Sequence, residues 1–401
     1  MKIIKAFAAV ACLLIIFYLT ELKIFAEEQT LPEIKFNNEN VELSDQIIVR
    51  GNDLYFSIKE FEKYFNIKVN HDKKSRSIVG KGIKNNSFSA KVGTKIVYIN
   101  GKKSILEKPL LLINGNPMVD LFFIEKVLGL NVHSGDGEEI FIDEYENKFT
   151  YDWADDNKLI AHAFGGIDGN TYSNSLEAFK YNYDNGHKIF EVDFTLTSDG
   201  ILVARHDWSV SLQNKLEQII PFAKQGKSLT VDEYKTLKIY QKYTPLTFEE
   251  VANIMVEHKD MYIVTDTKDA TESEIKQQFN ALVQTAKKVD PSILDRIIPQ
   301  IYNDAMLDTI MGIYEFKSII YTLYNKPTFN EDETIKFAYE NGIKVITTYY
   351  FRYSERFVDE LNKRGIKVFM HTFNTVESLQ KYKEEGVSGF YTDFLLPNDL
   401  K

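Results

Sequence analysis

The chain has 401 residues, which is enough for one barrel-sized domain and a smaller one. Its hydrophobic content of 44% and charged content of 26% are those of an ordinary globular protein, and its net charge of -10 excludes the basic surface that nucleic-acid binding requires. The same negative charge argues against nonspecific binding to anionic membranes.

The first 26 residues have the pattern of a secretion signal. Lys2 and Lys5 precede an almost wholly apolar run, 6–19, which is shorter than the roughly 20 residues of a membrane span. Cleavage after Ala26 would give a protein that is secreted or held at the cell surface, whereas an uncleaved segment would be a membrane anchor. Cys12, the only cysteine, lies inside this run, so the cleaved protein would contain no disulfide.

Residues 33–143 contain an internal repeat. Two similar segments, 47–56 and 111–120, each hold an Asn- and Gly-bearing turn between short alternating strands. Each segment is followed by a short amphipathic helix and then by a strand, at 76–79 and 139–142. A repeat of this kind predicts two copies of one supersecondary unit packed together as a small α+β domain.

This region resembles the copper amine oxidase N-terminal-like "stalk" domains of secreted bacterial proteins. The likeness rests on residues 98–103, on the turn at 113–115 and on the segment 129–132. It implies an accessory module without catalytic residues, which contacts a cell wall or surface. The polar, acidic segment 144–157 is expected to be a linker.

From residue 158 to 401, apolar strand-like runs alternate with helical patterns, as they do in parallel α/β proteins. Nine strands are expected, one more than an eight-stranded (β/α)8 TIM-type barrel needs. The extra one, 202–204, follows its neighbour after a three-residue turn and should return antiparallel as a hairpin. Thr247 with Glu250 predicts a capped helix start. The other strands are expected at 159–161, 189–194, 261–265, 297–301, 318–321, 344–347, 367–370 and 389–392.

The segment 209–244 interrupts this alternation. It is rich in lysine and tyrosine, and we expect an inserted lid or subdomain over the barrel mouth. Outside it, His133, His187 and His258 fall on expected loops or helices and are interpreted as surface residues.

The segment 160–208 places chemically active side chains at expected strand ends. Glu191 and Asp193 alternate with apolar residues, so their carboxylates share one face of a strand. They would repel each other without a cation, which predicts a divalent metal site, Ca²⁺ or Mg²⁺, with Asp266 as the third carboxylate. Ion pairs with barrel lysines are the alternative. His162 and His206 lie on either side and would transfer protons near neutral pH.

These motifs resemble the glycerophosphodiester phosphodiesterase family. The likeness covers roughly residues 157–397 and includes the histidine at the first strand end, the Glu-x-Asp pair, the His-Asp at 206–207 and the segments 265–268, 371–374 and 386–393. It implies that His162 and His206 act as general base and general acid on a phosphodiester. The attacking group would be the substrate's own hydroxyl, which gives a cyclic phosphate, or water. Lys268, expected on the same strand face as Asp266, would bind the phosphate.

The chain departs from the family at Ala163, where the family has the arginine of a His-Arg-Gly motif. We expect the missing guanidinium to be replaced by Lys268, by Arg205, or by N–H groups of the loop at Gly165 and Gly166.

A second departure is His371, which stands where the family has a tryptophan in the pocket wall. Trp208 is expected to supply the lost aromatic face.

Four functions compete. The favoured one is a secreted phosphodiesterase that acts on glycerophosphodiesters or on diesters derived from phospholipids or wall polymers. A phospholipase or sphingomyelinase-D-like enzyme would be indicated by an apolar face in 209–244. A binding protein would have lost turnover with Ala163. A glycosidase is least supported, since Glu191 and Asp193 share one strand instead of facing each other across a cleft.

Overall fold

This computed structural model describes residues 32–37, 39–41, 47–50, 53–65, 67–83, 86–134, 139–144, 148–268, 271–324 and 329–400. The predicted secretion signal, including Cys12, lies outside the described residues. The chain divides into two units, Met1–Val132 with Glu138–Ile142, and His133–Gly137 with Asp143–Lys401. Within the described ranges, no helix combines the length and apolarity needed to cross a membrane.

The first unit contains the predicted repeat as two hairpins in one sheet. Hairpin β3–β4 (Ile47–Arg50, Asp53–Ser57) joins hairpin β10–β11 (Leu111–Ile113, Asn116–Asp120) through antiparallel pairing of β4 with β11. The helices that follow, α2 (Ile58–Tyr64) and α3 (Leu121–Phe123) with the π-turn η1 (Ile124–Leu128), bury their apolar faces in a common core. The remaining strands are β1 (Glu33–Phe36), β2 (Glu39–Asn40), β5 (Lys68–Asp72), β6 (Ser77–Lys81), β7 (Ser87–Lys91), β8 (Ile96–Ile99), β9 (Lys102–Ile105), β12 (Asn131–Ser134) and β13 (Glu139–Asp143).

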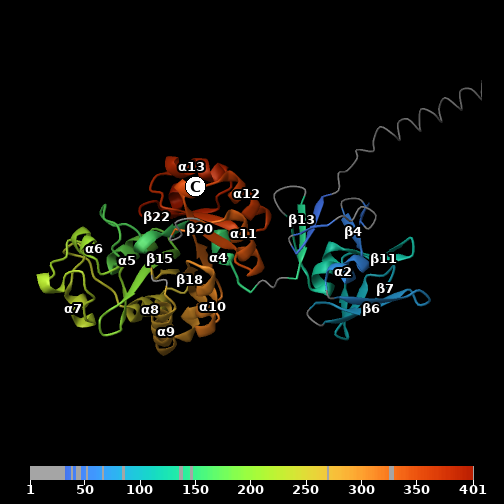
Figure 1. Ribbon diagram of the computed structural model, residues 1–401, viewed down its shortest axis with the longest axis horizontal. Coiled ribbons are helices and arrows are strands. Elements are labelled where there is room, and N and C mark those ends of the chain that lie inside the picture. The colour runs from blue at the N-terminus through green and yellow to red at the C-terminus, as the bar shows by residue number, and fades with distance from the viewer. Residues whose placement is uncertain are drawn as a thin grey trace, which may run out of the picture. The chain divides into compact units, whose positions relative to one another are not determined.

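The second unit is the predicted closed β/α barrel (Figure 1). Eight parallel strands follow the order β14-β22-β21-β20-β19-β18-β17-β15, and pairing of β14 with β15 closes the ring. The extra strand, β16 (Leu202–Ala204), pairs antiparallel with β15 as predicted. The parallel strands are β14 (Leu159–Ala161), β15 (Ile189–Leu196), β17 (Tyr262–Asp266), β18 (Ile297–Ile301), β19 (Ile320–Thr322), β20 (Val345–Tyr349), β21 (Lys367–His371) and β22 (Gly389–Thr392).

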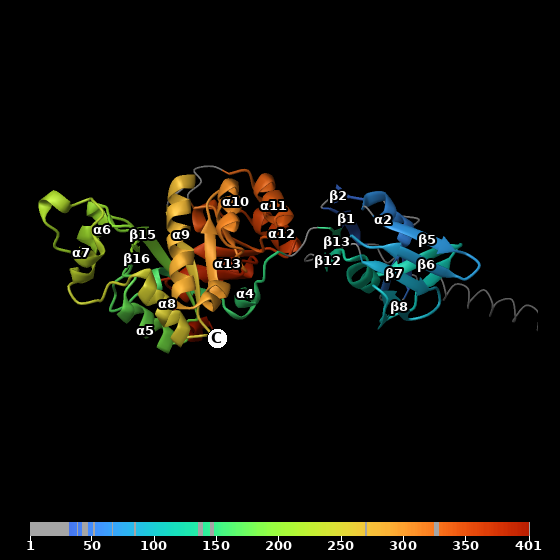
Figure 2. The same ribbon diagram turned by 90° about the horizontal axis from the view of Figure 1, so that it is seen from below.

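Helices cover the outside of the barrel (Figure 2), so the strands are buried on both faces, as parallel sheets require. Side-chain caps mark the helix starts, and Thr247 and Glu250 form the predicted capping box at the start of α8. The helices are α5 (Leu176–Asp184), α8 (Phe248–Glu257), α9 (Glu272–Val289), α10 (Asp304–Ile313), α11 (Glu331–Glu340), α12 (Glu355–Lys363) and α13 (Val376–Glu384).

The second half of the predicted linker belongs to the barrel. Helix α4 (Asp152–Asp156) lies there, and the Tyr151 hydroxyl donates to the Ile319 carbonyl at 2.8 Å. The Trp153 indole donates to Ser318 Oγ at 3.1 Å. The acidic composition suggested a solvated linker, but the aromatic side chains between the acids are buried. Residues 145–147 of that segment lie outside the described part.

The surface positions predicted for histidines were partly wrong. His187 is buried, and one ring nitrogen, Nε2, lies 2.9 Å from the Leu395 carbonyl. Burial lowers the pKa of His187 to about 4, so its ring is neutral at physiological pH. His258 is half-buried, with its ring against Phe179 and Tyr183. The side chain of His133 lies outside the described part of the chain.

The predicted insertion, 209–244, forms a small subdomain after β16. It contains α6 (Val210–Lys215), the 3-10 helix η3 (Phe222–Lys224) and α7 (Val231–Thr236), and both views place α6 and α7 together near the end of β15. Leu212 of α6 and Leu216, which directly follows this helix, pack with Tyr172, from the loop that follows the first barrel strand. The insertion therefore lies on the side of the barrel where the strands end.

Candidate active site

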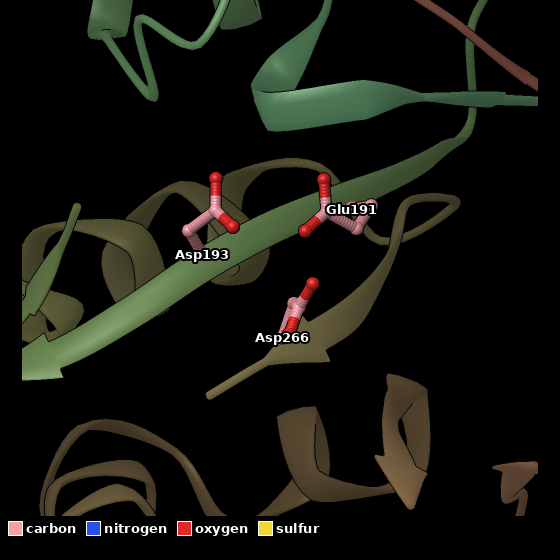
Figure 3. Close-up of side chains that lie close together, drawn as sticks. All are labelled: Glu191, Asp193 and Asp266. Carbon is pink, nitrogen blue, oxygen red and sulfur yellow. The ribbon is translucent and has the colours of Figure 1, made fainter. Parts of the chain in front are cut away.

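The ends of neighbouring strands bring the three predicted carboxylates together (Figure 3). Glu191 and Asp193 project from β15, and Asp266 ends β17, where it is directly opposite Asp193 in the strand register. One oxygen of each side chain lies within 4.8 Å of the others, and all three residues are buried. This is the C-terminal end of the barrel, where active sites of such folds lie.

The electrostatics of this cluster fit a divalent cation. Burial, and next the Asp193 carboxylate, raise the pKa of Glu191 to about 8. Its Oε2 atom accepts a hydrogen bond from the Ala163 N–H at 2.8 Å, while its Oε1 atom has no partner among the described residues. A buried acceptor without a partner is costly, and a hard cation such as Ca²⁺ or Mg²⁺ would satisfy it.

Lys268 supplies a positive charge to the same cluster. Its Nζ lies 3.0 Å from Asp193 Oδ1 and also pairs with Asp266. Lys268 reaches them from the loop after β17 with a φ of 58°, and not from the predicted strand face, because the strand ends at Asp266. An ion pair of the carboxylates with a barrel lysine, the alternative to a metal at this site, is therefore present.

Two tyrosines complete the surroundings of Asp266. The hydroxyls of Tyr302 and Tyr324 both donate to its Oδ1, the latter at 2.5 Å. Burial alone would raise its pKa, but the charge and hydrogen bond of Lys268, together with both hydroxyls, lower the pKa of Asp266 to about 2. The sequence places Tyr302 near a strand end, whereas Tyr324, which follows the short strand β19, was not predicted.

His162 is held beside the carboxylates by an aspartate that the sequence analysis did not select. Its Nδ1 lies 2.9 Å from Asp393 Oδ1, and its Nε2 lies 4.0 Å from Glu191 Oε2. Burial would lower its pKa, but the hydrogen bond with Asp393 and the Glu191 charge raise the pKa of His162 to about 9. Asn374 donates to Asp393 Oδ2 at 2.9 Å. The available signal was the position of Asp393 after the last strand, which neighbours the first in a closed barrel.

The loop after His162 cannot replace the missing arginine with its own N–H groups. The Gly165 N–H donates to the His162 carbonyl at 2.7 Å, and the Gly166 N–H donates to the Asp393 carbonyl at 2.5 Å. Ala163 has a left-handed backbone, with a φ of 52°, and its N–H is bound to Glu191. The loop shapes the site, and its donors are already occupied.

Arg205 and Trp208 contact each other between the β15–β16 hairpin and the insertion. The Arg205 side chain is 2% exposed, and its Nη1 donates to Gln218 Oε1 in the insertion at 2.8 Å. Its guanidinium lies 4.8 Å from the Trp208 ring, and the Trp208 indole donates to the Leu196 carbonyl at 2.9 Å. These side chains join the β15–β16 hairpin to the insertion, so their contacts lend no support to either expectation.

Tyr172 connects the two predicted catalytic histidines. Its ring meets His162 edge-on at 4.9 Å and His206 at 5.7 Å between ring centroids. His206 is half-buried, and its Nδ1 lies 2.6 Å from Asp207 Oδ2, the same arrangement that His162 has with its aspartate. Lys215 of the insertion holds its Nζ 3.8 Å from the centroid of the Tyr172 ring. Neither Tyr172 nor Lys215 was selected from the sequence.

His371 belongs to an aromatic wall inside the barrel. Its ring stacks on Tyr391 with 3.8 Å between centroids, and Tyr324 and Tyr349 lie close by. Burial, and next the charge of His162, lower the pKa of His371 to about 3, so the ring is neutral. The predicted role of His371 in binding substrate stays a prediction.

Each of the two units matches the profile of a known family. The profile of the "Glycerophosphoryl diester phosphodiesterase family" matches residues 165–396, more than half of the chain. The profile "Copper amine oxidase N-terminal domain" matches residues 33–142. A search of curated proteins found no match.

Solved structures resemble the barrel. A candidate glycerophosphoryl diester phosphodiesterase from Silicibacter pomeroyi has 16% identity and a TM-score of 0.50, covering 59% of this chain and 90% of its own. An Oleispira antarctica phosphodiesterase, solved with its product sn-glycerol-3-phosphate, has 19% identity and a TM-score of 0.48, with 59% and 93% covered. A Parabacteroides distasonis glycerophosphodiester phosphodiesterase has 19% identity and a TM-score of 0.48, with 59% and 92% covered. At these identities the likeness to the first structure shows the fold alone.

Proposed function

Because the chain belongs to the glycerophosphoryl diester phosphodiesterase family, we propose that this phosphoric diester hydrolase is metal-dependent and uses its two site histidines as general acid and base. Its substrates would be glycerophosphodiesters or related diesters derived from phospholipids or wall polymers. The observation that carries the proposal is the position of His162, hydrogen-bonded to Asp393 and 4.0 Å from Glu191 in a cluster of three buried carboxylates.

The two histidines have matching support for proton transfer. Asp393 and Asp207 each lie at the Nδ1 atom of one ring, which fixes the hydrogen there and leaves Nε2 to face the substrate. His162 would remove the proton from the attacking hydroxyl or water, and His206 would protonate the leaving alkoxide. Burial would lower the pKa of His162, whereas the hydrogen bond with Asp393 and the Glu191 charge raise it, so a cation that neutralises the Glu191 charge would favour the neutral ring that a base requires.

Glu191, Asp193 and Asp266 would hold the divalent ion. When bound, such an ion withdraws charge from phosphate oxygens. Lys268 would then bind a phosphate oxygen, because a cation at the carboxylates competes with the Lys268 ammonium for Asp193 and Asp266. Lys268 is the remaining candidate to replace the family's arginine, since Arg205 and the glycine N–H groups are engaged elsewhere.

A binding protein without turnover is the less supported alternative. Binding of an anion needs a cation in the site, but it does not need two imidazoles that each have an aspartate partner. That arrangement favours proton transfer and supports the enzyme over the binding protein.

We propose further that the protein works outside the cytoplasm, secreted or held at the cell surface, and that the stalk domain contacts the wall or surface. This rests on the signal-like residues 1–26.

Phosphorus NMR of the reaction tests the proposal. The protein would be incubated with Ca²⁺ or Mg²⁺ and with glycerophosphocholine, glycerophosphoethanolamine or lysophosphatidylcholine. We expect a phosphomonoester, or a cyclic phosphate that precedes it, and the order of appearance identifies the attacking group. A spectrum unchanged for every diester at full metal occupancy would contradict the proposal and favour the binding protein.

A further inference from the structure

The exposed apolar side chains of the second unit gather on one face. Among the described residues, one of them, Tyr181, lies on a helix at the side of the barrel. The others all follow strand ends, in the β15–β16 turn, in the insertion, after β20 and after β22. They are Ile201, Val210, Ile219, Phe222, Tyr350, Phe351 and Phe394. Because parallel strands end on the same side, these side chains surround the active-site mouth.

The most exposed of these side chains lie in the insertion. Phe222 is 91% exposed and Ile219 is 83% exposed, on either side of Pro221. Val210 is 42% exposed, and its side chain would lie 3.4 Å from a Cβ added at Gly226, four residues after Phe222. Exposing apolar side chains of this size to water is unfavourable, so a set of them on one surface marks a place that another apolar body covers.

The insertion does not need these side chains for its own core. That core is made by Leu212, Leu216, Ile239 and Tyr243, which pack inward against the loop that carries Tyr172. Helix α6 therefore contacts the active-site loop with one face, while Val210 at its start points to solvent. The apolar patch, defined as Val210, Ile219 and Phe222, thus belongs to the subdomain whose core packs against the active-site loop.

The charge of the insertion identifies the partner. Residues 209–244 contain six lysines and three carboxylates, a net charge of +3 in a chain of -10. Three of these lysines pair with carboxylates, Lys224 with Glu233, Lys235 with Glu250 and Lys242 with Asp168. The other three, Lys215, Lys227 and Lys238, have no ion-pair partner among the described residues, and Lys227 follows Phe222 by five residues. Charges interact over about 8–10 Å at physiological salt, so an anionic surface that approaches the insertion interacts with its lysines and not with the negative charges on the rest of the chain. The argument from net charge against anionic membranes does not hold for this face.

We propose that the C-terminal face of the barrel docks on an anionic lipid surface through the apolar patch, together with Tyr350 and Phe351, which are also exposed and follow the end of β20. Aromatic and aliphatic side chains beside lysines are the composition of interfacial lipid-binding segments. Docking brings the site mouth to the lipid headgroups, so the substrate is an amphiphilic phosphodiester, such as a lysophospholipid, that lies in the lipid surface. The substrate assignment rests on the proposed function, whereas the docking does not.

Binding to vesicles tests the docking. The full chain, the double variant Ile219→Ser/Phe222→Ser and the control Ile105→Ser would be sedimented with vesicles of phosphatidylcholine alone, or of equal parts phosphatidylcholine and phosphatidylglycerol. Ile105 is 69% exposed in the first unit, so the control removes a comparable apolar side chain. We expect the double variant to bind the anionic vesicles about tenfold or more weakly than the full chain, and the control to match it. Equal binding of all three proteins would overturn the proposal.

A site-specific readout removes the contribution of residues 1–26, which every variant keeps. Bromine-labelled lipid should quench the fluorescence of a Phe222→Trp variant more than that of Ile105→Trp, each measured against the wild-type signal. Equal quenching overturns the proposal. A second result would also overturn it: the wild type does not bind vesicles but self-associates, and the double variant does not self-associate. A second copy of the chain would then cover the patch.

Hydrolysis separates the docking from the proposed function. We expect Ile219→Ser/Phe222→Ser to hydrolyse glycerophosphocholine at the wild-type rate and vesicle-bound lysophosphatidylcholine about tenfold more slowly. If the wild type hydrolyses neither substrate but binds vesicles, the proposed phosphodiesterase activity is refuted and the docking proposal stands. Equal rates on both substrates for wild type and variant would refute the docking and leave the phosphodiesterase.

Discussion

Substitution of Asp393 by asparagine tests the orientation of His162. Asp393 accepts from His162 at 2.9 Å through one oxygen and from Asn374 at 2.9 Å through the other. An asparagine has one acceptor oxygen. If that oxygen stays with Asn374, its NH₂ group faces His162 Nδ1 and forces the ring hydrogen onto Nε2, the atom assigned to take a proton.

The size of the effect follows from the lost interaction. A hydrogen bond to a charged group contributes about 1.5–3 kcal/mol. At about 1.4 kcal/mol for each factor of ten, kcat should fall about 10- to 150-fold. The assay is steady-state hydrolysis of glycerophosphocholine at saturating metal, with urea unfolding to confirm that the variant is folded.

A matched control is Asp168→Asn, which removes an exposed carboxylate that pairs with Lys242 at 2.8 Å. We expect its kcat to be unchanged. If Asp393→Asn keeps kcat within about threefold of the wild type, Asp393 does not orient the catalytic ring and the reasoning fails.

Three further results are expected. Ca²⁺ or Mg²⁺ at one hundred times its Kd should stabilise the wild type by about 2.7 kcal/mol, and it should stabilise Asp193→Asn far less. Equal shifts in the midpoint temperature of thermal unfolding for the two proteins would mean that the ion binds elsewhere. The pKa of His187 is about 4 in the folded protein, below its ordinary value of 6.5. The free energy of unfolding should therefore be highest above pH 6.5 and fall as the pH falls through 4, because protonation of the ring favours the unfolded chain. Urea unfolding should show a loss of up to about 3 kcal/mol that His187→Gln abolishes, and an unchanged pH profile in the variant would exclude His187 as the cause. Gly166→Ala places a Cβ 2.3 Å from the Phe394 ring and should destabilise the protein by about 1–3 kcal/mol. The control Gly312→Ala, whose Cβ would have nothing within 4 Å, should not destabilise it. Equal unfolding midpoints of the two variants would refute the predicted crowding at Gly166.

The barrel was predictable because its signals are local. Alternating strand runs, the short turn before β16 and the capping box at Thr247 each determine nearby backbone, and the structure contains all of them. The carboxylate cluster was predictable for the same reason, since Glu191 and Asp193 share a strand face and the next parallel strand ends at Asp266.

The residues that were missed depend on contacts between distant segments. Asp393 meets His162 because the last strand closes the ring against the first, and Lys215 reaches Tyr172 because the insertion folds back over the loop. The contact of Arg205 with Gln218 was not predictable from its position beside His206, because it depends on how the insertion folds. Tertiary packing of this kind leaves no periodic pattern in the sequence.

The most direct test of the central claim is phosphodiester hydrolysis by the wild type and by His162→Ala, with Ca²⁺, with Mg²⁺ and with chelator. The account predicts turnover that either metal supports, that chelator abolishes and that restored metal recovers, with His162→Ala folded, metal-binding and inactive. Turnover that survives chelation, or that survives in His162→Ala, would contradict it.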